Sequence, residues 1–294
     1  MRIFVTGASG WIGSAVIPEL LEAGHQVLGL ARSDAAAESV GALGAAVHRG
    51  GLDDLHSLRA GAAASDGVIH LAYKHDFSRM ADAAHSDRQA IETLAAALEG
   101  TGGPFLVAGG TLGLAPGRIG TEQDVPDARI HPRVANGQLA LSYADRGVRA
   151  IMTRFAPTVH GAGDHGFIAT LVEVASAKGV SGYVEDGLNR WPAVHRLDAA
   201  HLVRLAVDVA PAGSVLHAVA EQGIETRTIA EAIGRRLEIP VVSVPADKAA
   251  DHFGWIGQFF AFDAPASNDL TRELLDWKPT HEGLVQDLEA DYYF

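Results

Sequence analysis

Short apolar runs alternate with Ala-rich stretches through the first 160 residues of the chain. The apolar runs, bounded by Gly, Asp or Pro, lie at residues 2–6, 26–30, 45–49, 67–71, 104–108 and 150–154. The Ala-rich stretches carry apolar residues at helical spacing and lie at residues 13–22, 54–63, 85–99 and 133–145. Strands that alternate with helices are typical of a parallel sheet with helices on both faces. The pattern therefore predicts an α/β fold whose doubly wound sheet has six parallel strands.

This alternation ends near residue 159, where the glycine-rich segment 160–166 begins. A helix-like stretch follows it, and then a loop with Trp and Pro at residues 189–195. Two more strand-like runs, at residues 214–218 and 241–244, flank a helical pattern at residues 228–237. The change of rhythm predicts a second, smaller lobe in the C-terminal half.

A glycine-rich turn with the sequence TGASGWIG occupies residues 6–13, between the first predicted strand and the first predicted helix. In such a turn Gly7 permits the sharp bend, Gly10 the approach of backbone to a pyrophosphate, and Gly13 close packing of helix and strand. The helix N-terminus favours negative charge. The turn therefore predicts a Rossmann-type domain that binds a dinucleotide through Gly7, Ser9, Gly10, Trp11, Ile12 and Gly13. The alternative is a glycine-rich turn that binds nothing.

The end of the second predicted strand distinguishes the two nicotinamide cofactors. NAD-binding domains usually carry an acidic residue there, which bonds the ribose hydroxyls. This chain has Ala31 at that position, followed by Arg32 and Ser33. A guanidinium and a hydroxyl both suit phosphate oxygens. The sequence therefore predicts NADP(H), with Arg32 and Ser33 at its 2′-phosphate, and a solvated surface arginine is the alternative.

Composition limits the partners of the protein. The 23 basic and 36 acidic residues give a net charge of -13, which disfavours nucleic acid and anionic membranes. The chain has no cysteine, which excludes disulfides and thiolate ligands. Its 14 histidines form no H-E-x-x-H pattern, so no metal site is predicted. With no signal peptide and no apolar membrane span, we expect a cytoplasmic protein whose partner is a small-molecule substrate.

Five segments together resemble extended or atypical short-chain dehydrogenases/reductases of the NAD-dependent epimerase/dehydratase family. They are residues 6–13, 68–73, 110–111, 154–161 and 191–198. The resemblance implies a Rossmann-type domain at residues 1–160, with parts of 186–222, and a substrate lobe at residues 161–185 and 223–294. Beyond the glycine turn, it implies cofactor contacts from Leu52 at the adenine, from Leu71, Ala72 and Tyr73 at the ribose, and from Phe155, Pro157, Thr158 and Val159 at the nicotinamide. Asp76, Phe77 and the helix from residue 85 would cover the cofactor.

The family's catalytic groups are a Ser or Thr and a Tyr-x-x-x-Lys pair, in which the lysine lowers the pKa of the tyrosine. Thr111 matches the first position. Counted back from Arg146-Gly147, the tyrosine position falls on Arg133 and the lysine position on Gly137, and neither residue can play the inherited role. The catalytic candidates are therefore Thr111, Arg133, Tyr73 as a replacement phenol, and His160 as a group that titrates near neutral pH. Core packing for Tyr73 and a loop histidine bonded to backbone for His160 are the alternatives.

Three functions remain open. The leading hypothesis is an NADP(H)-dependent oxidoreductase that reduces a carbonyl-type small molecule with substitute catalytic groups. The others are a non-catalytic NADP(H)-binding sensor or scaffold, and a sugar-nucleotide epimerase or dehydratase. The second lobe is rich in Trp, Phe and Val and has few basic residues, which favours an apolar or aromatic carbonyl compound over a sugar nucleotide. Helices like residues 133–145 pair two subunits in many relatives, so the resemblance is also compatible with a homodimer.

Overall fold

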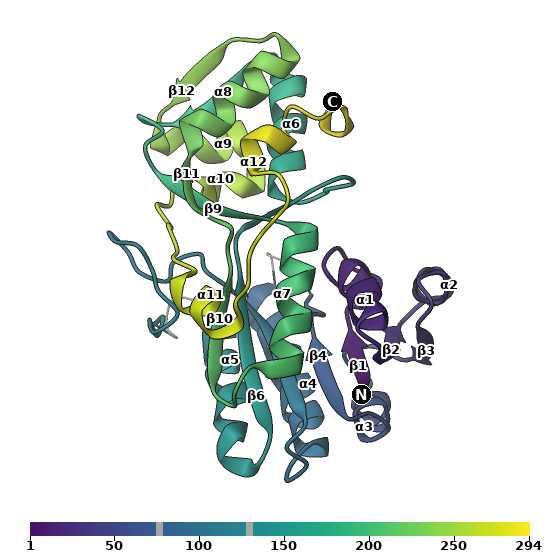
Figure 1. Ribbon diagram of the computed structural model, residues 1–294. Helices are drawn as coiled ribbons and strands as arrows, with labels where there is room; N and C mark the ends of the chain where they lie inside the picture. Colours follow the sequence, from purple (N-terminus) through teal and green to yellow (C-terminus); the bar gives the residue numbers. More distant parts are fainter. Residues whose placement is uncertain (75–78, 128–131) are drawn as a thin grey trace.

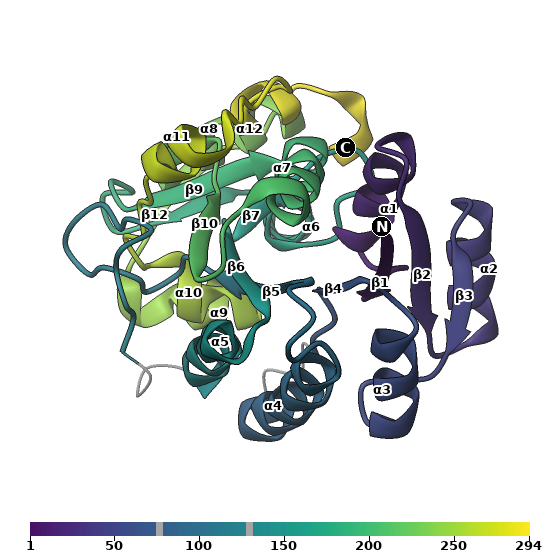
Figure 2. The same cartoon turned by 60° about the horizontal axis from the view of Figure 1, so that its bottom comes forward.

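The parallel sheet at the centre of the computed structural model has seven strands in the order β10-β6-β5-β4-β1-β2-β3 (Figures 1 and 2). The structure describes residues 1–74, 79–127 and 132–294. Each strand of this sheet pairs in parallel with its neighbours. The strands are β1 (Arg2–Thr6), β2 (Gln26–Ala31), β3 (Ala46–Arg49), β4 (Gly67–His70), β5 (Pro104–Gly110), β6 (Arg149–Phe155) and β10 (Ser214–Ala218). The predicted α/β class with a doubly wound, Rossmann-type sheet is confirmed.

The predicted number of strands in this sheet was wrong, because β10 is a seventh member. Its residue Leu216 lies opposite Thr153 of β6 in the parallel register. The long helix α7 (Arg196–Val209) precedes β10 and returns the chain to the sheet. An apolar run identifies a strand, but the sheet that the strand joins depends on such distant packing.

Helices cover both faces of the sheet (Figure 2). Helices α1 (Gly13–Glu22) and α7 pack on one face, and α3 (Leu55–Ala63), α4 (Met80–Ala97) and α5 (Pro132–Ser142) pack on the other, while α2 (Asp34–Ala42) lies beside β3. Along β1, Ile3 and Val5 belong to the core under α1 and α7, whereas Phe4 belongs to the core under α3 and α4. This alternation follows from the two-residue period of a strand.

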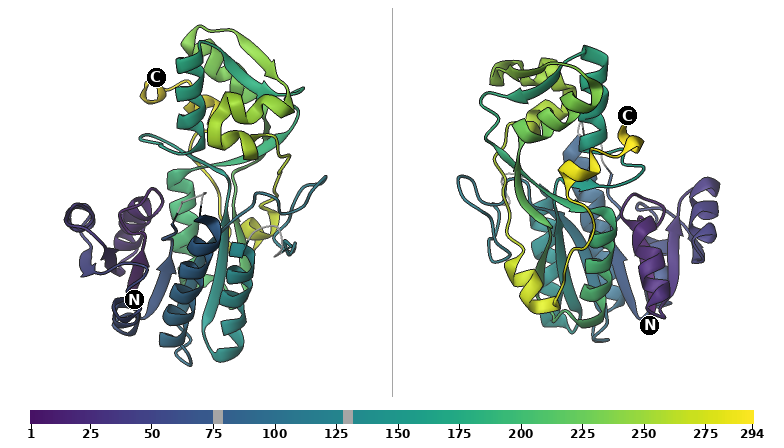
Figure 3. Two further views of the ribbon diagram at one scale, coloured as in Figure 1. Left: turned by 180° about the vertical axis from the view of Figure 1, so that it is seen from behind. Right: turned by 45° about the horizontal axis from the view of Figure 1, so that its top comes forward.

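The second lobe lies beyond the carboxyl ends of β1, β4, β5 and β6 (Figures 1 and 3). Its strands form two small sheets, ordered β11-β9-β7 and β12-β8. Its elements are β7 (Thr158–His160), α6 (Phe167–Lys178), β8 (Ser181–Val184), β9 (Arg190–His195), β11 (Glu221–Glu225), α8 (Thr226–Leu237), β12 (Val241–Val244), α9 (Ala249–Phe253), η4 (Gly254–Ile256), α10 (Gly257–Phe260) and α12 (Leu284–Asp287). No helix in the described part of the chain is long and apolar enough to span a membrane.

The C-terminal segment connects the two lobes (Figure 1). Helix α11 (Asp269–Leu275) packs against β10, and the fully buried Trp277 belongs to the core under α1 and α7. The indole of Trp277 donates to the carbonyl oxygen of Asp198 at 3.1 Å. Leu284 and Leu288 then enter the core of the second lobe. Residues 223–294, which the sequence analysis placed in the substrate lobe as a whole, therefore also contribute to the larger domain.

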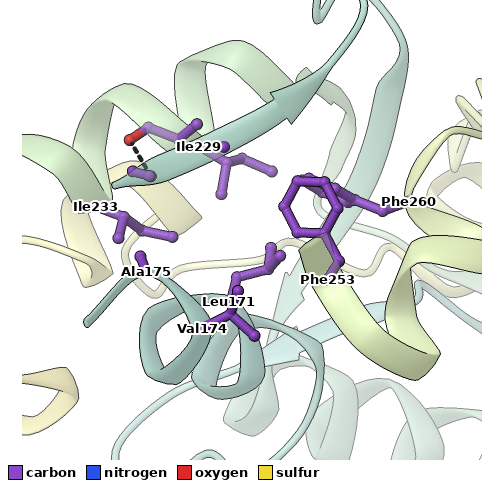
Figure 4. Close-up of a pocket in the computed structure, with 10 residues that line it drawn as sticks. Leu171, Val174, Ala175, Ile229, Ile233, Phe253 and Phe260 are labelled. Carbon is purple, nitrogen blue, oxygen red and sulfur yellow. Dashed lines mark hydrogen bonds between the residues drawn. The ribbon is translucent and has the colours of Figure 1, made fainter. Parts of the chain in front are cut away.

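The interior of the second lobe is closely packed (Figure 4). Leu171, Ile229, Ile233, Phe253 and Phe260 surround a space of only about 10 Å³, which is about the volume that a single water needs. The Ser181 hydroxyl at its edge donates to the carbonyl oxygen of Ala230 at 2.8 Å. This space is a packing gap and not a ligand site.

Candidate functional site

The glycine-rich turn lies at the carboxyl end of β1 and is held against the chain that follows β4. Gly7 has φ 69°, and a Cβ atom there would lie 2.8 Å from the amide nitrogen of Ala72. A Cβ atom on Gly13 would lie 2.1 Å from the carbonyl oxygen of Gly7, and Gly10 donates its backbone N–H to that same oxygen at 2.9 Å. Only glycine fits at these close approaches. Ser9 and Gly10 are exposed on the turn, where a pyrophosphate at the start of α1 would meet them.

Trp11 joins this turn to the strand that enters the second lobe. Its indole N–H donates to the carbonyl oxygen of Val159 in β7 at 2.8 Å. The Arg196 guanidinium lies 4.2 Å above the indole ring and donates to the Ser14 hydroxyl at 2.7 Å. The Trp11 side chain thus holds β7 against the turn. Of Trp11, only the backbone could then contact a cofactor. Ile12 is half-buried behind it, against the core under α1.

The end of β2 presents a cluster of polar and basic groups. Arg32 is exposed, and the Ser33 hydroxyl accepts from the Ala36 amide at 3.2 Å and so caps α2. Arg49, at the end of β3, donates to the Ser33 carbonyl oxygen at 2.7 Å and pairs with Asp34. Arg49 was not predicted as a site residue, although its position at the end of the neighbouring strand was the available signal.

The chain after β3 and β4 lies next to this cluster. Leu52 is half-buried against the core under α3 and α4. Leu71, Ala72 and Tyr73 follow β4 directly and are half-buried behind the glycine turn. The next residue, Lys74, holds the Asp53 carboxylate at 2.7 and 2.8 Å. Asp76 and Phe77, expected to cover the cofactor, lie outside the described residues.

Tyr73 and Arg133 come together at the carboxyl ends of β4 and β5. The central carbon of the Arg133 guanidinium lies 4.0 Å from the centroid of the Tyr73 ring, in a cation–π contact. Its Nη2 donates to the carbonyl oxygen of Ala108 in β5 at 3.0 Å. Burial raises the pKa of the Tyr73 phenol, and the positive charge of Arg133 opposes that rise. A phenol beside a fixed cation is the arrangement that a proton donor needs.

Thr111 and the strand after it complete this part of the site. Thr111 is buried directly after β5 and donates its backbone N–H to the carbonyl oxygen of Phe155 at 3.1 Å. Phe155 and Thr158 are buried, whereas Pro157 and Val159 are half-buried at the passage from β6 into β7. The structure therefore brings Thr111 beside the segment that the resemblance assigned to the nicotinamide.

The position of the family's lysine is filled by another residue. A Cβ atom on Gly137 would lie 1.8 Å from the Cε atom of Met152 in β6. Met152 therefore occupies the volume into which a longer side chain from α5 would extend. The family's lysine is therefore missing from the sequence, and the Met152 side chain occupies the space beside Gly137.

His160 lies where β7 enters the second lobe, and its side chain contacts Asp287 and His195 rather than Tyr73. Its side chain is 0% exposed, and its Nδ1 lies 2.7 Å from an Asp287 carboxylate oxygen of α12. Its ring packs edge-on against His195 with 5.4 Å between centroids. A groove of about 610 Å³ opens at this junction, lined by His195, Arg196 and residues from the segment 282–292. This buried hydrogen bond ties β7 to α12 within the second lobe.

A group of aromatic rings stands at the other end of β9. The Phe167 ring contacts Trp191 and Trp255, each with 5.2 Å between centroids, and Phe259 at 6.4 Å. Trp255 is 41% exposed. Strand β9 pairs with β7, which carries part of the segment assigned to the nicotinamide: Ala193 lies opposite Thr158. Trp191 stands two residues before Ala193 in β9. The abundance of Trp and Phe in this lobe was visible in the sequence, but the meeting of these four rings was not.

The fold and the glycine turn define a Rossmann-type protein of the extended short-chain dehydrogenase/reductase type. The family model for the NAD dependent epimerase/dehydratase family matches residues 3–218. The chain belongs to this family, so the resemblance found in the sequence is confirmed.

Relatives of known sequence include fungal and bacterial proteins. An uncharacterised protein of Schizosaccharomyces pombe is 49% identical over 296 residues, covering 100% of both chains. A ketoreductase of Stigmatella aurantiaca, named for 4-hydroxy-2-methyl-3-oxo-4-farnesyl-3,4-dihydroquinoline-1-oxide, is 27% identical over 86% of this chain and 80% of its own.

Solved structures show the same fold. A dTDP-glucose 4,6-dehydratase of Streptomyces venezuelae with bound NAD has a TM-score of 0.78 at 19% identity and is matched over 100% of this chain and 97% of its own. A UDP-glucose 4-epimerase of Thermus thermophilus with NAD has a TM-score of 0.75 at 18% identity, over 99% and 100%.

Proposed function

We propose that this protein is an NADP(H)-dependent reductase that acts on an apolar or aromatic carbonyl compound. The single observation that carries the proposal is the contact of the Arg133 guanidinium with the Tyr73 ring at 4.0 Å, at the carboxyl edge of the sheet where ligands of such folds bind. The glycine turn supports a dinucleotide there, and the two solved relatives named above hold NAD.

The basic cluster at the end of β2 supports NADP(H) over NAD(H). Arg32 is exposed, and Arg49 is fixed next to it through the Ser33 carbonyl oxygen. Two guanidinium groups and a hydroxyl match the charge and the oxygens of a 2′-phosphate. No acidic side chain stands at Ala31, where a ribose-binding carboxylate would come.

The chemistry divides between the cofactor and three side chains. Reduced NADP, when bound, supplies a hydride for the carbonyl carbon. The Tyr73 hydroxyl gives its proton to the carbonyl oxygen, and the Arg133 guanidinium stabilises the tyrosinate that remains. We assign a second hydrogen bond to the substrate's carbonyl oxygen to the Thr111 hydroxyl, whose bond to the Phe155 carbonyl oxygen is long at 3.5 Å. The tyrosinate then takes a proton from solvent, which completes the cycle.

The aromatic group of the second lobe supports the substrate class. Phe167, Trp255 and Phe259 form one group of rings, and helix α6, which begins at Phe167, packs against β7. Rings of this kind stack on planar apolar compounds. The Stigmatella ketoreductase is named for a bicyclic aromatic ketone with a farnesyl chain. A substrate of this general chemistry suits the lobe better than a nucleoside diphosphate, which needs cations.

Cofactor titration combined with a ketone panel tests the proposal. We expect NADPH to bind more tightly than NADH, and Arg32→Ala and Arg49→Ala each to weaken NADPH about tenfold or more, as for lost bonds to a charged group, with NADH unchanged. Arg59→Ala, an exposed arginine on α3, is the matched control. Tyr73→Phe should abolish oxidation of NADPH by quinone and aryl ketone substrates while NADPH still binds.

A non-catalytic sensor is the second candidate, and Gly137 favours it because this position, where the family carries its lysine, has no side chain. NADPH binding without turnover of any ketone would support the sensor. Turnover of dTDP- or UDP-sugars in place of ketones would support the epimerase or dehydratase hypothesis. Failure to bind either dinucleotide would contradict all three.

A further inference from the structure

A chain of four polar side chains runs through the interior below Tyr73 and Arg133. Thr6 ends β1, His70 ends β4, Asp87 lies in α4 and Asn136 lies in α5, and their exposures are 0%, 2%, 3% and 3%. Buried polar groups are costly unless they are bonded to one another. Such a chain between four separate elements therefore needs a reason beyond the packing of the core.

The hydrogen bonds of the chain are complete. Thr6 Oγ1 accepts from the Ala72 amide at 3.3 Å and lies 2.7 Å from Nδ1 of His70, to which it can donate. His70 Nε2 then donates to Asp87 at 3.3 Å. The other Asp87 oxygen accepts from the Asn136 amide at 2.7 Å, and the second amide hydrogen of Asn136 goes to the Ala84 carbonyl oxygen at 2.8 Å.

The Asp87 carboxylate stays charged although its side chain is buried. Burial raises the pKa of Asp87, but the hydrogen bond and charge of His70, then the charge of Arg133 and the hydrogen bond from Asn136, outweigh it. The pKa therefore lies below its usual range and the group stays ionised. Burial likewise lowers the pKa of Arg133, and the charge of Asp87 opposes this. Each charge offsets the cost of burying the other.

The helical spacing connects the two sites. Arg133 lies three residues before Asn136, so both side chains project from the same side of α5. The Asn136 bond to Asp87 fixes this side of α5 against α4. The His70 and Thr6 bonds fix Asp87, in turn, to the strand ends that carry Gly7 and Ala72.

We propose that Asp87 is a positioning residue that holds the Arg133 guanidinium over the Tyr73 ring, through its charge and through Asn136. The catalytic role of Arg133, stabilising the Tyr73 tyrosinate, rests on the proposed function. The positioning of Arg133 by Asp87 does not depend on turnover. Asp87 contacts neither substrate nor cofactor in this role. Its removal should move Arg133 and leave the dinucleotide turn in place.

Arginine NMR of the full-length protein tests this directly. A guanidinium above a tyrosine ring has resonances displaced by the ring current, and the Arg133 signals can be assigned with Arg133→Lys. We expect Asp87→Asn, which removes the charge at nearly constant volume, to abolish this displacement. The control is Asp82→Asn, an exposed aspartate on the same helix, which should leave the displacement unchanged. NADPH binding should be retained in both variants.

A second variant, Asn136→Ala, keeps the proposal testable if Asp87→Asn does not fold. Asn136→Ala leaves Asp87 bonded to His70 and should also reduce the ring-current displacement of Arg133. Unchanged Arg133 signals in Asp87→Asn, or in Asn136→Ala if the former does not fold, would overturn the proposal. In turnover, Asp87→Asn should lower kcat about tenfold or more, as for loss of a charged partner, with KM for NADPH unchanged. If the wild type reduces no ketone, the proposed function fails, while the NMR comparison still decides the positioning role.

Discussion

Single atoms decide whether the turn after β1 can form. The Cβ positions at Gly7 and Gly13 lie only 2.8 and 2.1 Å from backbone atoms, which cannot move aside as a flexible side chain can. By contrast, Gly41 in α2 has no atom within 4 Å of its Cβ position. Glycines that look alike in the sequence therefore differ in what they tolerate.

We predict that Gly13→Ala abolishes NADPH binding and lowers the free energy of unfolding by about 1–3 kcal/mol, the usual range for overpacking. The reason is the 2.1 Å approach of the new methyl to the Gly7 carbonyl oxygen. Gly41→Ala should instead raise stability by roughly 0.5–1 kcal/mol, as alanine does within helices. Urea unfolding and NADPH fluorescence titration measure both effects. Equal behaviour of the two variants would contradict this account.

The site residues that could be predicted from the sequence are those whose role follows from their own position in the chain. Arg32 and Ser33 were found because they follow a strand whose end has a known role. Arg49 was missed because its closeness to Ser33 depends on the β2–β3 register, in which Ala31 lies opposite Arg49. Asp87 gave no signal at all, since an aspartate in a helix is ordinarily a solvated side chain.

At the scale of elements, three histidines join β7, β9 and the C-terminal segment. The His195 ring lies between those of His160 and His281, edge-on to the first at 5.4 Å and stacked on the second at 4.6 Å. Its Nδ1 accepts the Leu197 amide at 3.2 Å and so caps α7. Burial lowers the pKa of His195 below its ordinary value of 6.5, the charges of His160 and His281 add to this, and Asp287 and Asp198 oppose it.

We predict that acid destabilises this junction. Since the folded protein holds the His195 proton less tightly than the unfolded chain does, the unfolded state binds more protons once the pH falls below 6.5, and stability is lost from there downward. His195→Asn, which keeps a capping acceptor, should lose less stability between neutral and mildly acidic pH than the wild type. Urea unfolding at both pH values measures the difference. His56→Asn, at an exposed position on α3, is the control, and an equal loss in all three proteins would refute the prediction.

The whole molecule is held together by segments that pass between the lobes. Trp277 lies in the core of the larger domain and Leu284 in that of the second lobe, while Trp11 ties the glycine turn to β7. The proposed cofactor site includes residues from both sides of this connection. Ligand binding should therefore stabilise the chain as one unit, while a homodimer stays a prediction of the family resemblance.

We predict a single thermal transition that NADPH shifts upward. At a concentration 100 times its Kd the ligand adds about 2.7 kcal/mol, which corresponds to a Tm increase of roughly 4–5 °C for a chain of this size. The Arg32→Ala and Arg49→Ala variants should show a smaller shift at the same NADPH concentration. Differential scanning calorimetry measures these shifts. Two separate transitions, with only one moved by NADPH, would show that the lobes unfold independently.

The sequence by itself determined the Rossmann-type fold, the glycine turn and the loss of the Tyr-x-x-x-Lys pair, because each is written in neighbouring residues or in a local period. Tertiary structure alone decided that β10 completes the sheet, that Tyr73 and Arg133 meet, and that Arg49 joins Ser33. It also decided that His160 pairs with Asp287 and that Asp87 bonds Asn136. These contacts join residues far apart in the chain, and their geometry follows from strand order and helix packing, which no local pattern encodes.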